Sequence, residues 1–294
     1  MIDFENIDCF EKFKTLENKS IDAIICDPPY GISFSGKTSN TDWDKKTDEE
    51  MLNFLSKFFF ESVRVLKDSG LMFICFAPTK RGVLLKAAES SKVYEHPENH
   101  FYYCRNKGRG AKFKLKSQRE DIFCFSKSEQ TPILDFTEFN EIVVNYRRLN
   151  QKPIGYALDI STGSRVPFYS DLDRSMFFTS PTFNNRFEKQ IHSTQKPFLL
   201  FTELIMLSTK PGELVFDPFA GSGSSGVAAD CCGRNWIGCE LDKEMYDKAN
   251  EWVHNYDKEL AEEYYKSRVR QAEEKPKKFS LNRKPKKFSL NKRT

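Results

Sequence analysis

Ile21-Asp22-Ala23-Ile24-Ile25-Cys26-Asp27-Pro28-Pro29-Tyr30 is the stretch on which the predicted fold depends. Its first six residues form a short and nearly uncharged apolar run, typical of a strand buried in a parallel sheet. Two consecutive prolines then end the strand, because neither has an N–H for the ladder and each fixes φ at about −65°. Asp27 and Tyr30 are therefore predicted at the carboxyl end of a buried strand, where open α/β sheets bind their ligands.

This tetrapeptide suits the capture of a planar, amide-like nitrogen. Asp27 can accept a hydrogen bond from an exocyclic NH2 group, and the Pro28 carbonyl, freed from sheet pairing, can accept a second. Tyr30 offers a ring face on which a nucleobase can stack. An ordinary proline turn with Asp27 as a capping residue would have the same sequence, so the tetrapeptide alone leaves both interpretations open.

A second strand and loop of this kind lie near the other end of the chain. The predicted strand 213–216 leads into Asp217-Pro218-Phe219-Ala220-Gly221-Ser222-Gly223-Ser224-Ser225-Gly226, which opens a helix, and the strand 236–239 ends in Glu240. Glu240 follows Gly221 at nearly the spacing expected for an acid that meets a ribose hydroxyl. The glycines allow a ligand to approach the backbone closely.

The spacing G-x-G-x-x-G is also found in proteins that bind NAD, so two ligands compete for this loop. Asp217 would repel a pyrophosphate but favour a sulfonium or an ammonium group. No second half resembling a hydride-transfer domain follows. S-adenosylmethionine carries a positive charge and a ribose but no phosphate, and it is the favoured ligand.

Hydrophobic periodicity predicts the elements around these two loops. A helix is expected over 51–66, with Gly70 as its C-cap, and the Gly/Ser/Thr/Asn-rich segment 33–47 is expected to be a mobile loop. Further helices are expected just after Asp8 and over 81–90, 197–209 and 243–270, and further strands over 71–76, 101–104 and 120–125.

The length and composition of the chain limit its number of domains and its location in the cell. The 294 residues suffice for one large domain, or for one domain with an insertion and a tail. No apolar run approaches the roughly 18 residues of a membrane span, and the acidic start of the chain is unlike a signal peptide. We expect a cytoplasmic protein with no membrane partner.

The eight cysteines form no C-x-x-C pair, so we expect buried, reduced thiols and no metal site. The chain also has no Pro-Cys dipeptide of the kind expected for a nucleophile that attacks cytosine C5.

Positive charge gathers in two segments. The net charge is +4, yet residues 275–294 carry nine positive charges and no acid, so the rest of the chain is negative. This tail spells KPKKFSLN twice, at 275–282 and 284–291, and is predicted to be a disordered arm that binds nucleic acid. A localisation signal or a partner-binding peptide is the alternative. A second basic run, also without acid, spans 105–119, and we expect it to contact a phosphate backbone rather than form a solvated face.

Asp27-Pro28-Pro29-Tyr30 and Phe219-Ala220-Gly221-Ser222-Gly223 together resemble the amino-group DNA methyltransferases, which modify adenine N6 or cytosine N4. The tetrapeptide precedes the glycine loop, an order similar to that of the β group of these enzymes. The segment 192–197 resembles the one that precedes the glycine loop in that group, although Ser193 stands where the family usually has proline. Asp8-Cys9 resembles the element that contacts the cofactor adenine, and 120–127 resembles a late strand of the catalytic half.

The resemblance implies an α/β fold with a doubly wound, mostly parallel, Rossmann-like methyltransferase sheet. It implies a catalytic half at 1–130, an inserted target-recognition region at 131–190, a cofactor-binding half at 191–270 and a basic tail at 271–294. The implied catalytic residues are Asp27, Pro28, Pro29 and Tyr30. The implied cofactor-binding residues are Asp8, Cys9, Lys196, Asp217, Phe219, Gly221, Gly223, Glu240 and Asp242. The expected DNA-binding residues are Arg105, Lys107, Arg109, Lys112, Lys114, Lys116 and Arg119.

The implied reaction is direct methyl transfer from S-adenosylmethionine to adenine N6 in double-stranded DNA, after the base leaves the duplex. Cytosine N4 is the alternative target, although those enzymes more often have Ser in place of Asp27. RNA or protein-glutamine methyltransferases usually place the glycine loop first, and a non-catalytic DNA-binding module would not need an intact site. The sequence leaves open whether the protein forms a homodimer and whether a cognate restriction endonuclease accompanies it.

Overall fold

The computed structural model describes residues 1–31, 46–109, 117–132, 134, 155–159, 164–168, 176–177, 188, 190–192 and 194–263. For 104–109, 117–119 and the segments between 155 and 177, the description covers the backbone alone. The predicted loop 33–47 lies almost entirely outside these residues. The predicted tail and much of the predicted target-recognition region also lie outside them.

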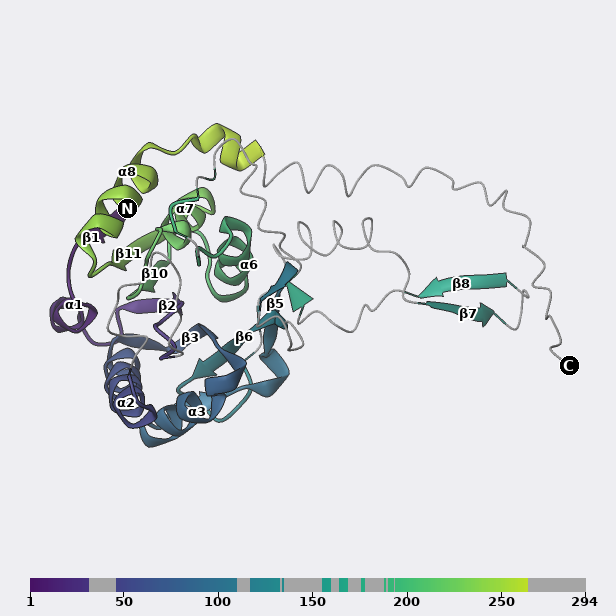
Figure 1. Ribbon diagram of the computed structural model, residues 1–294, viewed down its shortest axis with the longest axis horizontal. Helices are drawn as coiled ribbons and strands as arrows, with labels where there is room; N and C mark the ends of the chain where they lie inside the picture. Colours follow the sequence, from purple (N-terminus) through teal and green to yellow (C-terminus); the bar gives the residue numbers. More distant parts are fainter. Residues whose placement is uncertain are drawn as a thin grey trace, which may run out of the picture.

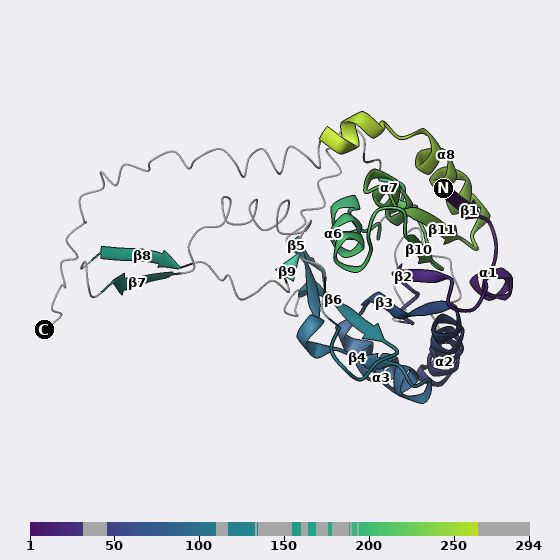
Figure 2. The same cartoon turned by 180° about the vertical axis from the view of Figure 1, so that it is seen from behind.

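The main sheet has the doubly wound order that the sequence predicts (Figure 1). Its strands follow one another as β1 (Ile2–Glu5), β11 (Asn235–Cys239), β10 (Leu214–Asp217), β2 (Ile21–Cys26), β3 (Leu66–Phe76), β6 (Ser117–Ser126), β5 (Phe101–Arg109) and β9 (Met176–Phe177). The pairings from β1 to β3 are all parallel, whereas β6 is antiparallel to both β3 and β5. The short β4 (Tyr94–Glu95) pairs with β6, and Figure 2 shows β9 beside β5 at the far edge.

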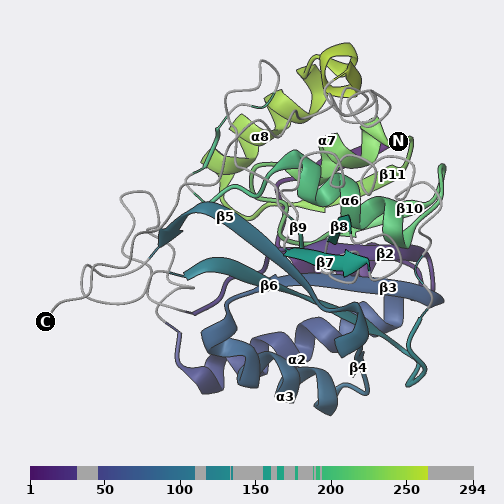
Figure 3. The ribbon, with the colours of Figure 1, turned by 90° about the vertical axis from the view of Figure 1, so that its right-hand side faces the viewer.

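Helices cover both faces of this sheet, which Figure 3 shows nearly edge-on. One layer contains α2 (Asp48–Val65) and α3 (Arg81–Ser90), and the other comprises α6 (Phe198–Ser208), α7 (Ser224–Cys231) and α8 (Lys243–Asn255). Helix α1 (Cys9–Thr15) belongs to the first layer, because its buried residues share an apolar core with α2 and α3. Each layer encloses its own apolar core against the sheet. The predicted mostly parallel α/β fold is confirmed. Among the described residues, no helix combines the length and the apolar character that crossing a membrane requires.

Strand β2 lies at the centre because both of its faces are apolar. Ala23 and Ile25 pack into the core below α6 and α7, while Ile24 and Cys26 pack into the core below α1 and α2. Asp22 fixes the strand to both neighbours: its carboxylate accepts the Leu214 N–H of β10 at 2.9 Å and pairs with Lys67 of β3 at 2.6 Å. The central position of β2 therefore follows from its sequence.

Two predicted helix ends are wrong. Helix α2 ends at Val65, and Gly70 lies inside β3 instead of capping the helix. A Cβ there would lie 2.8 Å from the Asp22 carbonyl oxygen, so lack of space rather than a helix end requires glycine. Helix α8 ends at Asn255, because the Tyr256 backbone is extended and its hydroxyl donates to Asp230 of α7 at 2.6 Å.

Strand β1 has no counterpart among the predicted elements. It pairs with β11, in a register that places Ile2 beside Trp236 and Glu5 beside Cys239. Lys12 of α1 ties the strand down, because its buried ammonium pairs with Asp3 at 2.9 Å and with Glu5 at 2.6 Å. The first residues thus join the sheet edge beside the predicted cofactor-binding half.

Within the predicted target-recognition region, 131–190, the structure describes three short strands. β7 (Gly155–Asp159) and β8 (Ser164–Phe168) form an antiparallel pair in a sheet of their own, and β9 extends the main sheet. Recognition of a DNA sequence by this region stays a prediction.

Trp236 makes the contact between β11 and α7 depend on two glycines. Its ring is fully buried, and a Cβ on Gly238 would lie 2.0 Å from ring atom Cη2. A Cβ on Gly226 of α7 would lie 3.0 Å from the same ring. The close packing of helix on strand beside the glycine loop therefore requires both glycines.

We expect Gly238→Ala to lower the free energy of unfolding by about 3 kcal/mol, because the added methyl overpacks a closed core. Urea unfolding followed by tryptophan fluorescence measures this change. Gly82→Ala is the matched control: Gly82 is exposed in α3 with no atom within 4 Å of a Cβ. It should raise stability by about 0.5 kcal/mol through helix propensity. Equal stabilities for the two variants would contradict the packing described for Trp236.

Candidate active site

The two predicted loops lie side by side because their strands are neighbours. β2 and β10 run parallel, with Ala23 beside Val215 and Ile24 beside Phe216. The carboxyl ends of both strands therefore reach the same edge of the sheet. Burial is the main cause that raises the pKa of Asp217, and the negative charge of Asp27 raises it further, as expected for carboxylates at adjacent strand ends. The structure thus brings together stretches of chain that begin 190 residues apart.

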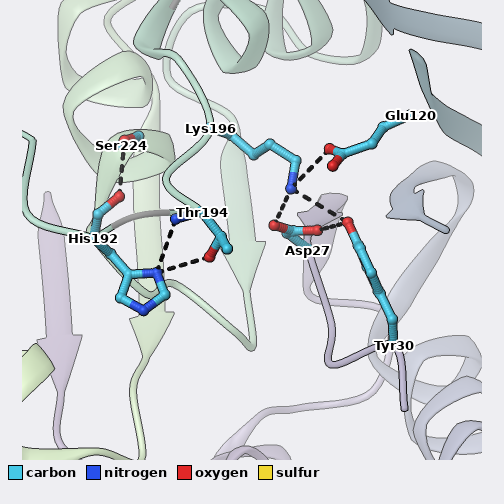
Figure 4. Close-up of polar contacts among 8 residues, drawn as sticks. Asp27, Tyr30, Glu120, His192, Thr194, Lys196 and Ser224 are labelled. Atoms are coloured by element: carbon cyan, nitrogen blue, oxygen red, sulfur yellow. Dashed lines mark hydrogen bonds and ion pairs between the residues drawn. The ribbon is translucent and has the colours of Figure 1, made fainter. Parts of the chain in front are cut away.

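Asp27 is held by contacts to both of its carboxylate oxygens (Figure 4). Oδ1 accepts a hydrogen bond from the Tyr30 hydroxyl, and Oδ2 forms an ion pair with Lys196 Nζ. The Tyr30 ring packs edge-on against Phe76 of β3, with ring centroids 5.1 Å apart. Pro28 is buried and Pro29 half-buried, so the turn after β2 is firmly seated.

Lys196, predicted among the cofactor-binding residues, lies against the tetrapeptide. Besides Asp27, its ammonium contacts Glu120 Oε2 at 3.1 Å and the Tyr30 hydroxyl at 3.3 Å. Its side chain is only 5% exposed. Glu120, on β6, was not among the predicted site residues. Its position as the first acid after the acid-free run 105–119 is a signal that the sequence does contain.

Asp217 is the buried anchor of the glycine loop. It is 1% exposed, and its carboxylate accepts the Phe219 N–H at 3.0 Å and the Ser225 hydroxyl. Burial raises the pKa of Asp217 to about 7, although these two hydrogen bonds act in the opposite direction. Phe219 packs on α2, where its ring centroid lies 5.8 Å from that of Phe54 and 5.5 Å from that of Phe58.

The glycines of the loop are required by conformation and by space. Gly221 and Gly223 have φ of +52° and +77°, in the left-handed region that favours glycine. A Cβ on Gly223 would also lie 2.3 Å from Val253 Cγ2 of α8. The backbone conformation therefore favours glycine at both positions, and close packing on α8 excludes a side chain at Gly223.

Glu240 stands across from the glycine loop at the end of β11. Its Oε2 accepts the Gly221 N–H at 3.0 Å and its Oε1 accepts the Asp242 N–H at 2.8 Å. Burial raises the pKa of Glu240. Asp242 caps α8 by accepting the Met245 N–H at 2.8 Å.

Asp8 and Cys9, at the start of α1, lie at the same edge of the sheet as Glu240. Asp8 caps α1 by accepting the Phe10 N–H at 2.8 Å, and burial raises the pKa of the Cys9 thiol to about 12. Asn6, which the sequence did not single out, donates to the backbone carbonyls of Glu240 at 2.8 Å and Leu241 at 3.1 Å. These contacts dock the start of α1 beside Glu240.

His192 lies between the two groups of carboxylates. Burial lowers its pKa, while Asp27 and Asp242 both act to raise it. Its Nδ1 lies 2.7 Å from the Thr194 hydroxyl (Figure 4). Across the described part of the chain, no three histidine, cysteine or acidic residues are grouped so as to hold a metal ion.

The predicted DNA-binding residues are described only in part. Arg105, Lys107 and Arg109 belong to β5 and Arg119 to β6, where the backbone alone is described. Lys112, Lys114 and Lys116 lie outside the described residues. Their contact with DNA stays a prediction.

This sheet order defines a Rossmann-like α/β fold. Solved structures agree: this chain superposes with a TM-score of 0.58 on the M1.HpyAVI–SAM complex, at 21% identity over 87% of this chain and all of that one. For the cytosine-N4-specific PvuII DNA methyltransferase the TM-score is 0.61, at 16% identity over 92% of each chain. At such identities the likeness concerns the fold.

Sequence comparison identifies the family. The model of the DNA methylase family, the N6 and N4 methyltransferases, matches residues 21–251, and the chain belongs to that family. Its members take the methyl group from S-adenosylmethionine.

Several DNA methyltransferases are similar to this chain in sequence. The type II methyltransferase M.HinfI of Haemophilus influenzae is 29% identical over 262 residues, 82% of this chain and 65% of that protein. M1.MboII of Moraxella bovis is 27% identical, covering 83% of this chain and 93% of that protein. The DNA adenine methyltransferase YhdJ of Escherichia coli K12 is 26% identical, covering 81% and 77%.

The raised pKa of Asp217 predicts how stability depends on pH. Unfolded, this carboxyl releases its proton near pH 3.8, whereas in the folded protein it does so near pH 7. The folded state therefore binds the extra proton between these values, and stability falls as pH rises through this range. Between pH 5 and pH 8, we expect wild type to lose roughly 2–3 kcal/mol more than Asp217→Asn. Urea unfolding at both pH values measures the difference, and parallel pH profiles would contradict the raised pKa.

Proposed function

We propose that this chain is a site-specific DNA methyltransferase that transfers a methyl group from S-adenosylmethionine to adenine N6 in double-stranded DNA. The main support is the position of the Asp27 carboxylate, one strand away from the glycine loop after β10. Asp as the first residue of the tetrapeptide, and the relative named as a DNA adenine methyltransferase, favour adenine over cytosine.

The loop after β10 suits a positively charged ligand that has no phosphate. Burial raises the pKa of both Asp217 and Glu240; the charge of Glu240 raises the pKa of Asp217 further, and the charge of Asp242 raises that of Glu240. The three acids therefore lie close together, and this acidic surface would repel a pyrophosphate. The backbone at Gly221 and Gly223 provides close approach, and Glu240 keeps lone pairs for a ribose hydroxyl. Asp8, Cys9, Phe219 and Asp242 complete the proposed cofactor site. S-adenosylmethionine, when bound there, supplies an electrophilic methyl group.

The tetrapeptide would hold the target base. The base must leave the duplex because its amino group is otherwise paired, and extrusion costs a few kcal/mol. Stacking on Tyr30 and hydrogen bonds to Asp27 and the Pro28 carbonyl offset this cost, while Pro29 keeps the turn rigid. Transfer of the methyl group to the amino nitrogen would break its bond to sulfur, and the electrons of that bond would stay on sulfur. Asp27 stabilises the positive charge that develops on nitrogen, and then accepts the proton that nitrogen loses.

We expect Asp27→Ala and Glu240→Ala to separate chemistry from cofactor binding. Asp27→Ala should lower the rate of methylation at least about a hundredfold and leave the affinity for S-adenosylmethionine within about twofold. Glu240→Ala should weaken that affinity about tenfold or more, because the ribose hydroxyl then has no carboxylate to bind. Mass spectrometry of nucleosides from treated DNA and calorimetry with the cofactor provide the two measurements.

The same mass spectrometry distinguishes the target bases. N6-methyl-2′-deoxyadenosine as the product supports the proposal, and N4-methyl-2′-deoxycytidine would replace it with the alternative. Wild-type turnover by Asp27→Ala would refute the role of that carboxylate. Failure of the wild-type chain to bind S-adenosylmethionine would favour a non-catalytic DNA-binding module.

The basic run 105–119 is proposed to bind the DNA backbone. For each lysine that no longer neutralises a phosphate, the slope of log K against log salt becomes shallower by about 0.9. We therefore expect the triple variant Lys112→Ala, Lys114→Ala, Lys116→Ala to lower this slope by about 2–3, measured by fluorescence anisotropy between about 50 and 200 mM salt. Lys243→Ala with Lys248→Ala is the control, because these exposed lysines pair along α8 with acids one turn away. An unchanged slope in the triple variant would contradict the proposed interaction.

A homodimer and a cognate restriction endonuclease stay possible partners, which the sequence leaves open.

A further inference from the structure

We propose that Lys196 and Glu120 are positioning residues for methyl transfer. Before the target base arrives, Lys196 holds the Asp27 carboxylate, and on base entry its ammonium passes to Glu120, freeing the charge of Asp27 for the reacting amino group. The inference rests on the proposed function of Asp27.

Both oxygens of Asp27 are engaged in the structure, as Figure 4 shows. The Tyr30 hydroxyl donates to Oδ1 and the Lys196 ammonium contacts Oδ2. The methylated amino nitrogen gains positive charge, and an ammonium on the same carboxylate opposes that charge. Lys196 therefore neutralises the carboxylate that the reaction needs.

Glu120 offers Lys196 a second position within reach. Its Oε2 lies 3.1 Å from Lys196 Nζ, and its side chain is only 13% exposed. An ammonium as buried as that of Lys196 cannot be left without a carboxylate at low cost. Because Nζ already contacts both acids, the transfer requires only a small displacement.

The backbone around Lys196 is fixed on both sides. Before it, the Gln195 side chain accepts the Ile191 N–H at 2.8 Å. After it, the buried Glu188 carboxylate accepts the Phe198 N–H at 2.9 Å at the start of α6. Glu120 is held in β6, opposite Tyr103 of β5. With the backbone held on both sides, the end of the lysine side chain is the part that can move between Asp27 and Glu120.

A double-mutant cycle tests this coupling. Glu120→Gln should keep Lys196 on Asp27 and lower kcat about tenfold, with the Kd for S-adenosylmethionine within about twofold of wild type. In a Lys196→Met background the competing ammonium is gone, so adding Glu120→Gln should change kcat by less than about twofold. Additive effects of the two substitutions would overturn the proposal.

Matched variants exclude a merely structural effect. Glu95→Gln removes a carboxylate of similar burial (15% exposed) that pairs with Arg81 at 2.9 Å, on a strand that also joins β6. It should leave kcat unchanged. Lys196→Arg keeps the charge, so in that background Glu120→Gln should again lower kcat; this second cycle also serves if Lys196→Met does not fold. Absence of the effect in the Lys196→Arg background would count against the proposal.

The same assay separates this inference from the proposed function. A wild-type chain that yields no methylated nucleoside would refute the function itself. An active wild type with Glu120→Gln at full kcat would overturn only the role of the Lys196–Glu120 pair.

Discussion

The parallel pairing of β2 with β10 is the constraint on which the site depends. Asp22 enforces it, since one carboxylate accepts the Leu214 N–H of β10 and also pairs with Lys67 of β3. Both strands then end at the same edge, and each passes into a turn that cannot continue the ladder: two prolines after β2, a left-handed glycine after β10. Because the carboxyl ends of parallel neighbours lie on the same edge of the sheet, the acidic turn and the glycine loop are adjacent.

The carboxylates at the two strand ends are stabilised in different ways. Beside β10, burial favours protonation of Asp217, and Glu240 is engaged by two backbone N–H groups. Beside β2, Asp27 is compensated by a lysine brought from a distant segment of the chain. The acidic surface thus suits a cationic donor on one side and a nitrogen that becomes cationic on the other. This distribution of charge is consistent with the membership of the chain in the DNA methylase family.

The sequence predicted this geometry wherever a local rule decides the structure. Apolar strands that end in proline or glycine are short-range signals, and they located Asp27, Gly221, Gly223 and Glu240 at strand ends. Prediction failed where residues that are distant in sequence determine the structure. Gly70 looked like a helix cap, but the space beside Asp22 explains it. Lys196 reached Asp27 across 169 residues, and its contact with Glu120 depends on a fold that no periodicity encodes.

The edge pairing of β1 with β11 has a consequence for biosynthesis. Ile2 takes its place beside Trp236, so β1 must wait until β11, more than 200 residues later in the chain, has been synthesised before the two can pair. Such sequence-distant contacts slow folding, because a long loop must close before any pairing rewards it. Lys12, which already gathers Asp3 and Glu5, ties this early segment to α1 through contacts between neighbours in sequence. The ion pairs of Lys12 can therefore hold β1 against α1 before β11 has been synthesised.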